Sequence, residues 1–129
     1  MLRTDEDIPY IEKPWGYERV WAETDHYMAK YFYIRAGQKL SRKYYEGKDH
    51  TLYILTGPLI LELGPDDDND DILKLGVLDG ESYHITPGSV YRIGAPSTTY
   101  AEVIEVATPK DRGAIRLEDD YGRIQEISA

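Results

Sequence analysis

The sequence predicts an all-β fold, a sandwich or barrel built from short strands. Apolar, β-branched and aromatic residues gather in short runs at regular spacing along the chain. Glycine and proline separate these runs, as they do at turns between strands. No long stretch has the spacing of an amphipathic helix, and the one candidate helix is a short C-terminal segment within residues 116–128.

Turn residues divide the chain into eight predicted strands. The first ends at the turn glycine Gly37, the second leads into the turn EGKDH, and the third stops at Gly57. The sixth is bounded by Gly80 and by the Pro87-Gly88 pair. In chain order the strands lie within residues 26–37, 39–45, 51–57, 58–64, 65–76 (after an acidic turn), 80–88, 89–96 and 98–109.

The composition fits a single soluble domain that fills residues 1–129, with 41% hydrophobic and 30% charged residues. No apolar run approaches the roughly 20 residues that cross a bilayer, and the acidic N-terminus lacks the layout of a signal peptide. Because the chain has no cysteine, it forms no disulfide and no thiolate metal site. We expect a cytoplasmic location.

The net charge of −9 argues against binding to nucleic acid or to an anionic membrane, since the long-range field repels both. It does not exclude a small anionic ligand held by a few local arginines or lysines.

One acidic run, DDDNDD at residues 66–71, has the alternating acids of a calcium-binding loop. However, Asp71 stands where that loop needs a turn glycine, and Val77 stands where it needs the closing glutamate. The pattern therefore favours a solvated hairpin tip.

Five motifs occur in the order found in one known family. They are KPWGYERV at 13–20, AGQKLS at 36–41, GESYHITPGSVYRI at 80–93, EVIEV at 102–106 and IRLEDDYGR at 115–123. In these motifs the chain resembles the cupin superfamily, and within it the mannose-6-phosphate isomerase domain at the C-terminus of bifunctional mannose-1-phosphate guanylyltransferase enzymes. The resemblance implies a small jelly-roll β-barrel, open at one end around a sugar-sized cavity. Together with the apolar strand faces, it also implies a homodimer.

The resemblance implies that the family's metal ligands are replaced in this chain. Their positions hold Lys43, Tyr45, His50 and Tyr91. An ammonium must lose its proton before it binds a metal, and neutral phenols bind divalent metals weakly. A single imidazole does not supply the usual three or four protein ligands. We therefore predict no metal site and no cofactor.

Residues two apart share one face of a strand, so Lys43 and Tyr45 point together. If the hairpins pair as in cupins, His50 and Tyr91 converge with them at the mouth of the barrel. The leading hypothesis is a site for a sugar phosphate or nucleotide sugar, with metal-independent isomerase or epimerase activity. His50 would act as base or acid, Tyr45 or Tyr91 would donate a proton, and Lys43 would hold an anion.

The residues leave two other interpretations open. One is a binding module or pseudoenzyme, which holds a carbohydrate without converting it. The other is a degenerate barrel whose tyrosines fill the former metal site.

Further candidates are Tyr31, Tyr33 and Arg123 as substrate-binding residues. Tyr31 and Tyr33 share a face, but the sequence does not say whether it is the face of the cavity. Strand alternation places His84 away from the cavity, as a surface or interface histidine, and it turns Arg42 and Arg92 to the side opposite Lys43 and Tyr91. We also expect a solvated His26 in a turn and a packing role for Trp15.

Overall fold

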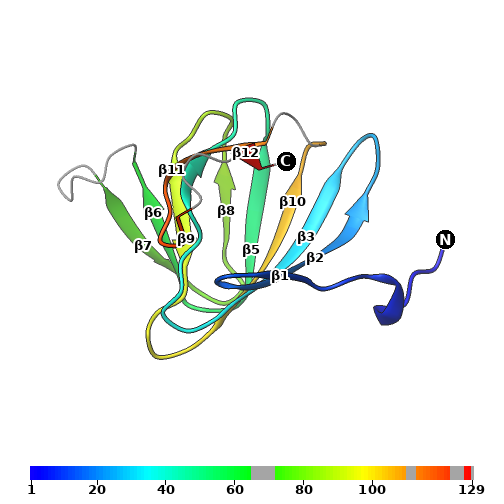
Figure 1. Cartoon of the computed structure of the whole chain (residues 1–129), viewed down its shortest axis with the longest axis horizontal. Helices are drawn as coiled ribbons and strands as arrows, with labels where there is room; N and C mark the ends of the chain where they lie inside the picture. Colours follow the sequence, from blue (N-terminus) through cyan, green and yellow to red (C-terminus); the bar gives the residue numbers. More distant parts are fainter. Residues whose placement is uncertain (65–71, 110–112, 123–126, 129) are drawn as a thin grey trace.

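The computed structural model describes residues 1–64, 72–109, 113–122 and 127–128, and these form two facing antiparallel sheets (Figure 1). The first, sheet A, has six strands in the order β1 (Ile11–Lys13), β2 (Gly16–Glu23), β3 (Met28–Ile34), β10 (Ala101–Ala107), β5 (His50–Thr56) and β8 (Ser82–Ile85). The second, sheet B, has the order β12 (Ile127–Ser128), β11 (Ala114–Glu118), β4 (Arg42–Tyr44), β9 (Tyr91–Gly94), β6 (Leu59–Leu63) and β7 (Leu73–Val77). A 3-10 turn, η1 (Asp5–Asp7), precedes the barrel.

This architecture confirms the predicted all-β jelly roll. Each of the eight predicted runs holds a strand. Two strands extend one residue beyond their run: β5 begins one residue before it, and β7 ends one residue after it. The crossed strand order, in which β10 lies between β3 and β5, is what joins distant parts of the chain into one sheet. No helix in the described part of the chain is long and apolar enough to cross a membrane.

The prediction of a possible C-terminal helix within residues 116–128 is wrong for the part of that segment that the structure describes. Arg116 to Glu118 belong to β11, whose backbone pairs with β4. The register sets Ile115 opposite Tyr44 and Arg116 opposite Lys43. Pairing between segments far apart in the sequence thus overrides a local pattern. The sequence also missed β1, β2 and β12, and its acidic turn at 66–71 lies outside the described residues.

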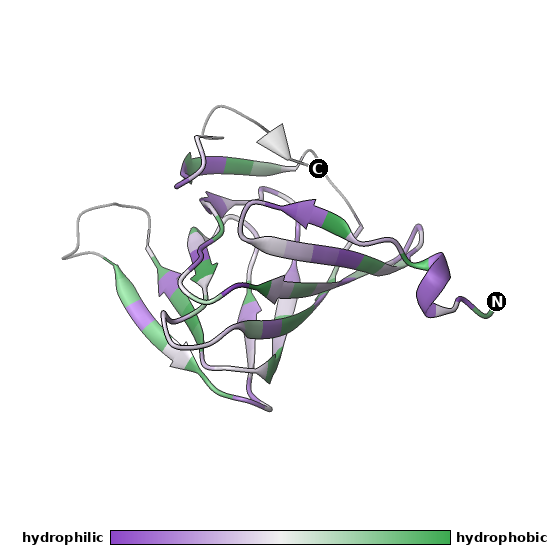
Figure 2. Cartoon of the chain, turned by 60° about the horizontal axis from the view of Figure 1, so that its bottom comes forward, coloured by the Kyte–Doolittle hydropathy of each residue, from purple (hydrophilic) through white to green (hydrophobic). Residues whose placement is uncertain are grey.

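The interior of the barrel changes from apolar at one end to polar at the other. Hydrophobic and hydrophilic residues alternate along the strands (Figure 2), but the inward positions of β3 and β10 are polar at one end. The register pairs Ile34 with Ala101, Phe32 with Val103 and Lys30 with Glu105. The apolar end is fully buried and stabilises the fold by removing this surface from water. The polar end is therefore the place to look for a site.

The KPWG motif closes the apolar end through a tight contact with β3. Gly16 has a φ of 156°, and a Cβ there would lie 1.9 Å from the backbone oxygen of Tyr33, so only glycine fits. This close approach places Trp15 in the core, where its ring meets Phe32 edge to face at 5.8 Å between centroids. Trp15 is thus a packing residue, as predicted, although one side of it also borders the cavity described below.

Arg42 and Arg92 point away from the interior, as strand alternation predicts, yet both are buried. Arg42 contacts Glu62 at 2.7 Å, and Arg92 contacts Glu118 at 2.8 Å. The expectation of outward arginines did not foresee these acidic partners, each of which lies two strands away in sheet B. The pairs compensate the burial of the two guanidinium groups, which would otherwise be costly.

Candidate functional site

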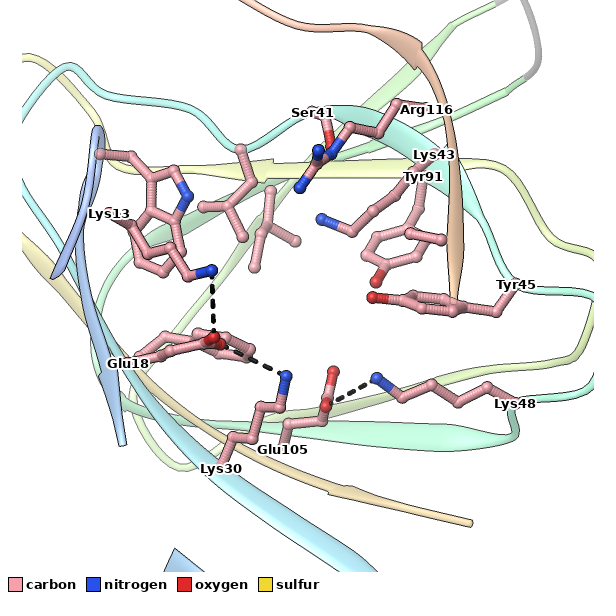
Figure 3. A pocket seen from close by; sticks show the side chains of 15 residues that line it. Lys13, Glu18, Lys30, Ser41, Lys43, Tyr45, Lys48, Tyr91, Glu105 and Arg116 are labelled. Atoms are coloured by element: carbon pink, nitrogen blue, oxygen red, sulfur yellow. Dashed lines mark hydrogen bonds and ion pairs between the residues drawn. The ribbon is translucent and has the colours of Figure 1, made fainter. Parts of the chain in front are cut away.

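A cavity opens at the polar end of the barrel, between sheets A and B (Figure 3). It contains about 580 Å³ of space free of protein atoms, counted out to its open mouth. An apolar floor is formed by Trp15, Phe32, Leu40 and Ile93. Charged and phenolic side chains form the walls, so the cavity combines an apolar base with polar groups that can orient a ligand.

The charges in the walls are unbalanced toward positive. Five cationic side chains and two carboxylates line the cavity. The cations are Lys13, Lys30, Lys43, Lys48 and Arg116, and the carboxylates are Glu18 and Glu105. The whole chain carries a net charge of −9, so the local charge of the cavity is opposite in sign to the net charge of the protein.

Two ion-pair groups hold part of this charge in place (Figure 3). Glu18 lies 3.5 Å from the Nζ of Lys13 and 3.4 Å from that of Lys30. Lys48 donates a hydrogen bond of 3.0 Å to Glu105, and both side chains are buried. Burial alone would raise the pKa of Glu105, but nearby cations, Lys48 foremost, outweigh it and lower the pKa of this carboxyl group. Glu105 therefore stays ionised.

Lys43 lies on β4, between Arg116 of β11 and Tyr91 of β9 in the register of sheet B. Its amine points into the cavity (Figure 3) and lies 5.5 Å from the centre of the Tyr91 ring. Within the described residues it has no hydrogen bond and no ion pair. Burial, followed by repulsion from Lys48, lowers the pKa of Lys43 to about 7. A large share of these amines is thus neutral at physiological pH.

Tyr45 and Tyr91 supply the two phenols of the cavity wall. Lys48 lies 4.2 Å from the centre of the Tyr45 ring, a cation–π contact. Tyr91 is buried, and burial, with Tyr45 and Glu105 nearby, raises its pKa well above the ordinary value. Tyr91 therefore remains protonated and can donate a hydrogen bond or a proton to a ligand.

His50 lies behind these two rings and does not line the cavity. Its imidazole meets Tyr45 and Tyr91 edge to face, at 5.7 Å and 5.3 Å between centroids. Only 2% of the residue is exposed, and neither ring nitrogen has a hydrogen-bond partner within the described structure. Burial lowers the pKa of His50 to about 4, so the ring is neutral. The structure brings the four predicted residues together, but His50 is not part of the lining of this cavity; it borders a second, more open hollow with His26, Asp49 and His84.

Tyr31 and Tyr33 lie on the outer face of sheet A, so neither lines the cavity into which we expected a substrate to bind. Tyr31 donates a hydrogen bond to Glu102, and Tyr33 stacks between Tyr17 and Tyr100 at 5.1 Å and 5.2 Å between centroids. Strand alternation explains the correction, because the residues between and before them, Phe32 and Lys30, take the inward positions instead. Arg123 lies outside the described residues.

The remaining histidines are on the surface. His26 is exposed, and the exposed His84 contacts Asp49 at 2.5 Å, away from the cavity. In the described part of the chain, no three side chains of His, Cys, Asp or Glu come together as a metal site would require.

The sequence analysis missed the charged residues that sheet A and β11 contribute to the cavity. Lys30 and Glu105 each occupy the inward register of a strand whose other inward positions are apolar. A charged residue in phase with core residues was the available signal. Arg116 could not be found in this way, because β11 itself was not predicted.

The buried imidazole gives the protein a stability that depends on pH. An unfolded histidine takes up a proton near pH 6.5, whereas His50 does so near pH 4 in the fold. Between these values the unfolded state binds more protons, so stability falls as the pH falls. From pH 7 to pH 5 this residue should remove about 2 kcal/mol. Denaturant unfolding of a His50→Leu variant should lack this part of the loss, and the exposed control His26→Gln should keep it. An equal acid sensitivity in all three proteins would contradict the assignment.

No family model matches the sequence. One curated relative, a mannose-1-phosphate guanylyltransferase of Sinorhizobium fredii, is 27% identical over 128 residues. The alignment covers 98% of this chain but only 22% of that enzyme, so the chain spans about a fifth of the relative it matches.

Solved structures share the fold at low sequence identity. The capsular polysaccharide assembling protein CapF of Staphylococcus aureus matches with a TM-score of 0.74 and 14% identity, over 86% of this chain and 32% of that one. The polyketide cyclase RemF of Streptomyces resistomycificus matches with a TM-score of 0.72 and 19% identity, over 98% and 94%. KdgF from Halomonas sp. matches with a TM-score of 0.67 and 16% identity, over 84% and 94%. The chain is therefore a cupin-fold protein that resembles the C-terminal domain of mannose-1-phosphate guanylyltransferase enzymes.

Proposed function

We propose that the cavity binds an anionic carbohydrate, a sugar phosphate or a nucleotide sugar. The observation that carries this proposal is the excess of cationic side chains around the open, polar-walled cavity in an acidic chain. A buried cation without a counter-charge costs stability, and an anionic ligand would supply the missing charge. Lysine and arginine are also the side chains that proteins use to hold phosphate groups.

The chemistry of the remaining wall suits a sugar. The phenols of Tyr45 and Tyr91 can hydrogen-bond hydroxyl groups, and the apolar floor at Trp15 and Phe32 can pack against the faces of a sugar ring. The name of the Sinorhizobium fredii relative includes a sugar phosphate, and the name of CapF includes a polysaccharide. Both names support the carbohydrate part of the proposal. Since the chain spans 22% of that relative, the relative's whole activity is not transferred to it.

A second candidate is catalysis at the same site, as a metal-independent isomerase or epimerase. Lys43 favours it, because an amine whose pKa is about 7 can both take up and release protons at neutral pH. Tyr91, with its raised pKa, would donate a proton and not remove one. His50, the base expected from the sequence, has no direct access to the cavity. If no conversion of a bound sugar phosphate occurs over a long incubation, the protein is a binding module.

Calorimetric titration with mannose 6-phosphate, GDP-mannose and unmodified mannose tests the binding proposal. We expect the two anionic compounds to bind at least about tenfold more tightly than mannose, because hydrogen bonds to charged groups contribute about 1.5–3 kcal/mol each. Lys30→Met and Arg116→Gln should each weaken the binding of the anionic compounds about tenfold and leave the affinity for mannose unchanged. Lys74→Met is the matched control, since Lys74 is an exposed lysine of β7. Equal affinity for mannose and its phosphate would contradict the proposal.

The homodimer and the cytoplasmic location expected from the sequence remain predictions. For the dimer, the outer face of sheet A exposes apolar side chains on β5 and β10. Tyr53, Leu55 and Val106 are 45%, 41% and 49% exposed, and β5 pairs with β10 along this region. Exposed apolar patches mark interfaces between protein chains.

We expect light scattering on a sizing column to report a dimer, and a Tyr53→Glu, Leu55→Lys double variant to be monomeric. The control Leu78→Lys, at another exposed leucine, should remain a dimer. A monomeric parent protein would disprove the predicted assembly without affecting the cavity.

A further inference from the structure

One cavity lysine differs from the others in its surroundings. Lys13, Lys30 and Lys48 each have a carboxylate oxygen within 3.5 Å. For Lys43, the described residues supply no such contact, although only 8% of the residue is exposed. A lysine that serves only to hold charge gains from a fully ionised amine, and this position disfavours ionisation.

The groups that face the Lys43 amine come from every wall of the cavity. They are Lys48 before β5, Glu105 on β10, Lys30 on β3, Arg116 on β11, and the phenols of Tyr45 and Tyr91. Three of these are cations and only one is a carboxylate, which is already bonded to Lys48. Burial and neighbouring cations are the two conditions that leave a lysine amine neutral and nucleophilic.

We propose that Lys43 is a covalent, carbonyl-reactive residue, whose amine forms an imine with the aldehyde or ketone group of an anionic open-chain sugar. This inference rests on the proposed function, because the remaining cations of the cavity, Lys30 and Arg116 foremost, would hold the phosphate or other anionic group. It assigns to Lys43 a role beyond the anion holding expected from the sequence.

The step balances without an external reagent. The lone pair of the Lys43 Nζ attacks the carbonyl carbon, and one of the two protons of the amine passes to the carbonyl oxygen to give a carbinolamine. The hydroxyl group is then protonated and departs as water, the carbon–nitrogen double bond forms, and the second proton of the nitrogen returns to the group that protonated the hydroxyl. Nothing is oxidised or reduced. Tyr91 is placed to donate the proton to the departing hydroxyl group, since it lies beside Lys43 and stays protonated.

Reductive trapping tests this inference. The whole chain is incubated with glyceraldehyde 3-phosphate and cyanoborohydride, and the modified lysines are located by peptide mass spectrometry. We expect the Lys43 peptide to be labelled at least about tenfold faster than the Lys74 peptide, because burial and the neighbouring cations leave the amine of Lys43 partly neutral at pH 7. Excess mannose 6-phosphate should suppress labelling at Lys43 and leave Lys74 unchanged.

Two variants separate covalent chemistry from charge. Lys43→Arg keeps the cation but cannot form the imine, so it should lose the adduct. Lys43→Met loses the adduct and removes the charge. In the parent protein, the labelling rate at Lys43 should rise with pH and level off above about pH 7.

The outcomes distinguish this inference from the proposed function. Tight binding of mannose 6-phosphate, with labelling of Lys43 no faster than of Lys74, would overturn the imine and leave the anion site standing. Selective labelling of Lys43 that is equal for glyceraldehyde and its phosphate, with no binding of mannose 6-phosphate, would support the imine and overturn the anion site.

Discussion

The hydrogen-bonded ion pair between Lys48 and Glu105 is the interaction on which the polar half of the barrel depends. Glu105 occupies an inward position of β10, in line with Val103, where a core residue would normally lie. A carboxylate buried there without a partner would cost several kcal/mol. With Lys48 holding it at 3.0 Å, the barrel can remain polar and open at this end. Within the pair, Lys48 disfavours the ionisation of Lys43, and Glu105 acts in the opposite direction.

We propose that this barrel holds its ligand through side-chain charge. At the positions implied by the family resemblance, the chain presents an amine and two phenols, with an imidazole enclosed behind them. These groups do not assemble a metal site in the described residues, but together with Lys30 and Arg116 they surround a cavity that suits an anion. The buried amine of Lys43 and the imidazole of His50, which has no hydrogen-bond partner in the described structure, both lower the free energy of unfolding.

The fold could be predicted from the sequence because its signals are local and repeated. Turn glycines and prolines mark the strand ends, and alternation placed Lys43 and Tyr45 on one face and the arginines on the opposite face. The family resemblance added Tyr91 to the same cavity. The content of the cavity depends on pairing between distant strands, which alternation within one strand does not reveal. Arg116 enters through β11, a strand that was not predicted, and His50 is screened by tyrosine rings whose packing has no sequence signature. Tyr31 and Tyr33 were undecided for the same reason, because alternation fixes that they share a face but not which face.

The central claim is that the cavity contains a buried, partly neutral lysine beside a binding site for an anionic ligand. The most direct test is the pKa of Lys43, followed by NMR through the chemical shift of its Cε, with a Lys43→Arg variant to assign the signal. The account predicts a pKa near 7 in the free protein. Binding of a sugar phosphate by the neighbouring cations should raise it, because a nearby negative charge favours the protonated amine. A pKa near that of an exposed lysine, unchanged by saturating mannose 6-phosphate, would contradict the account.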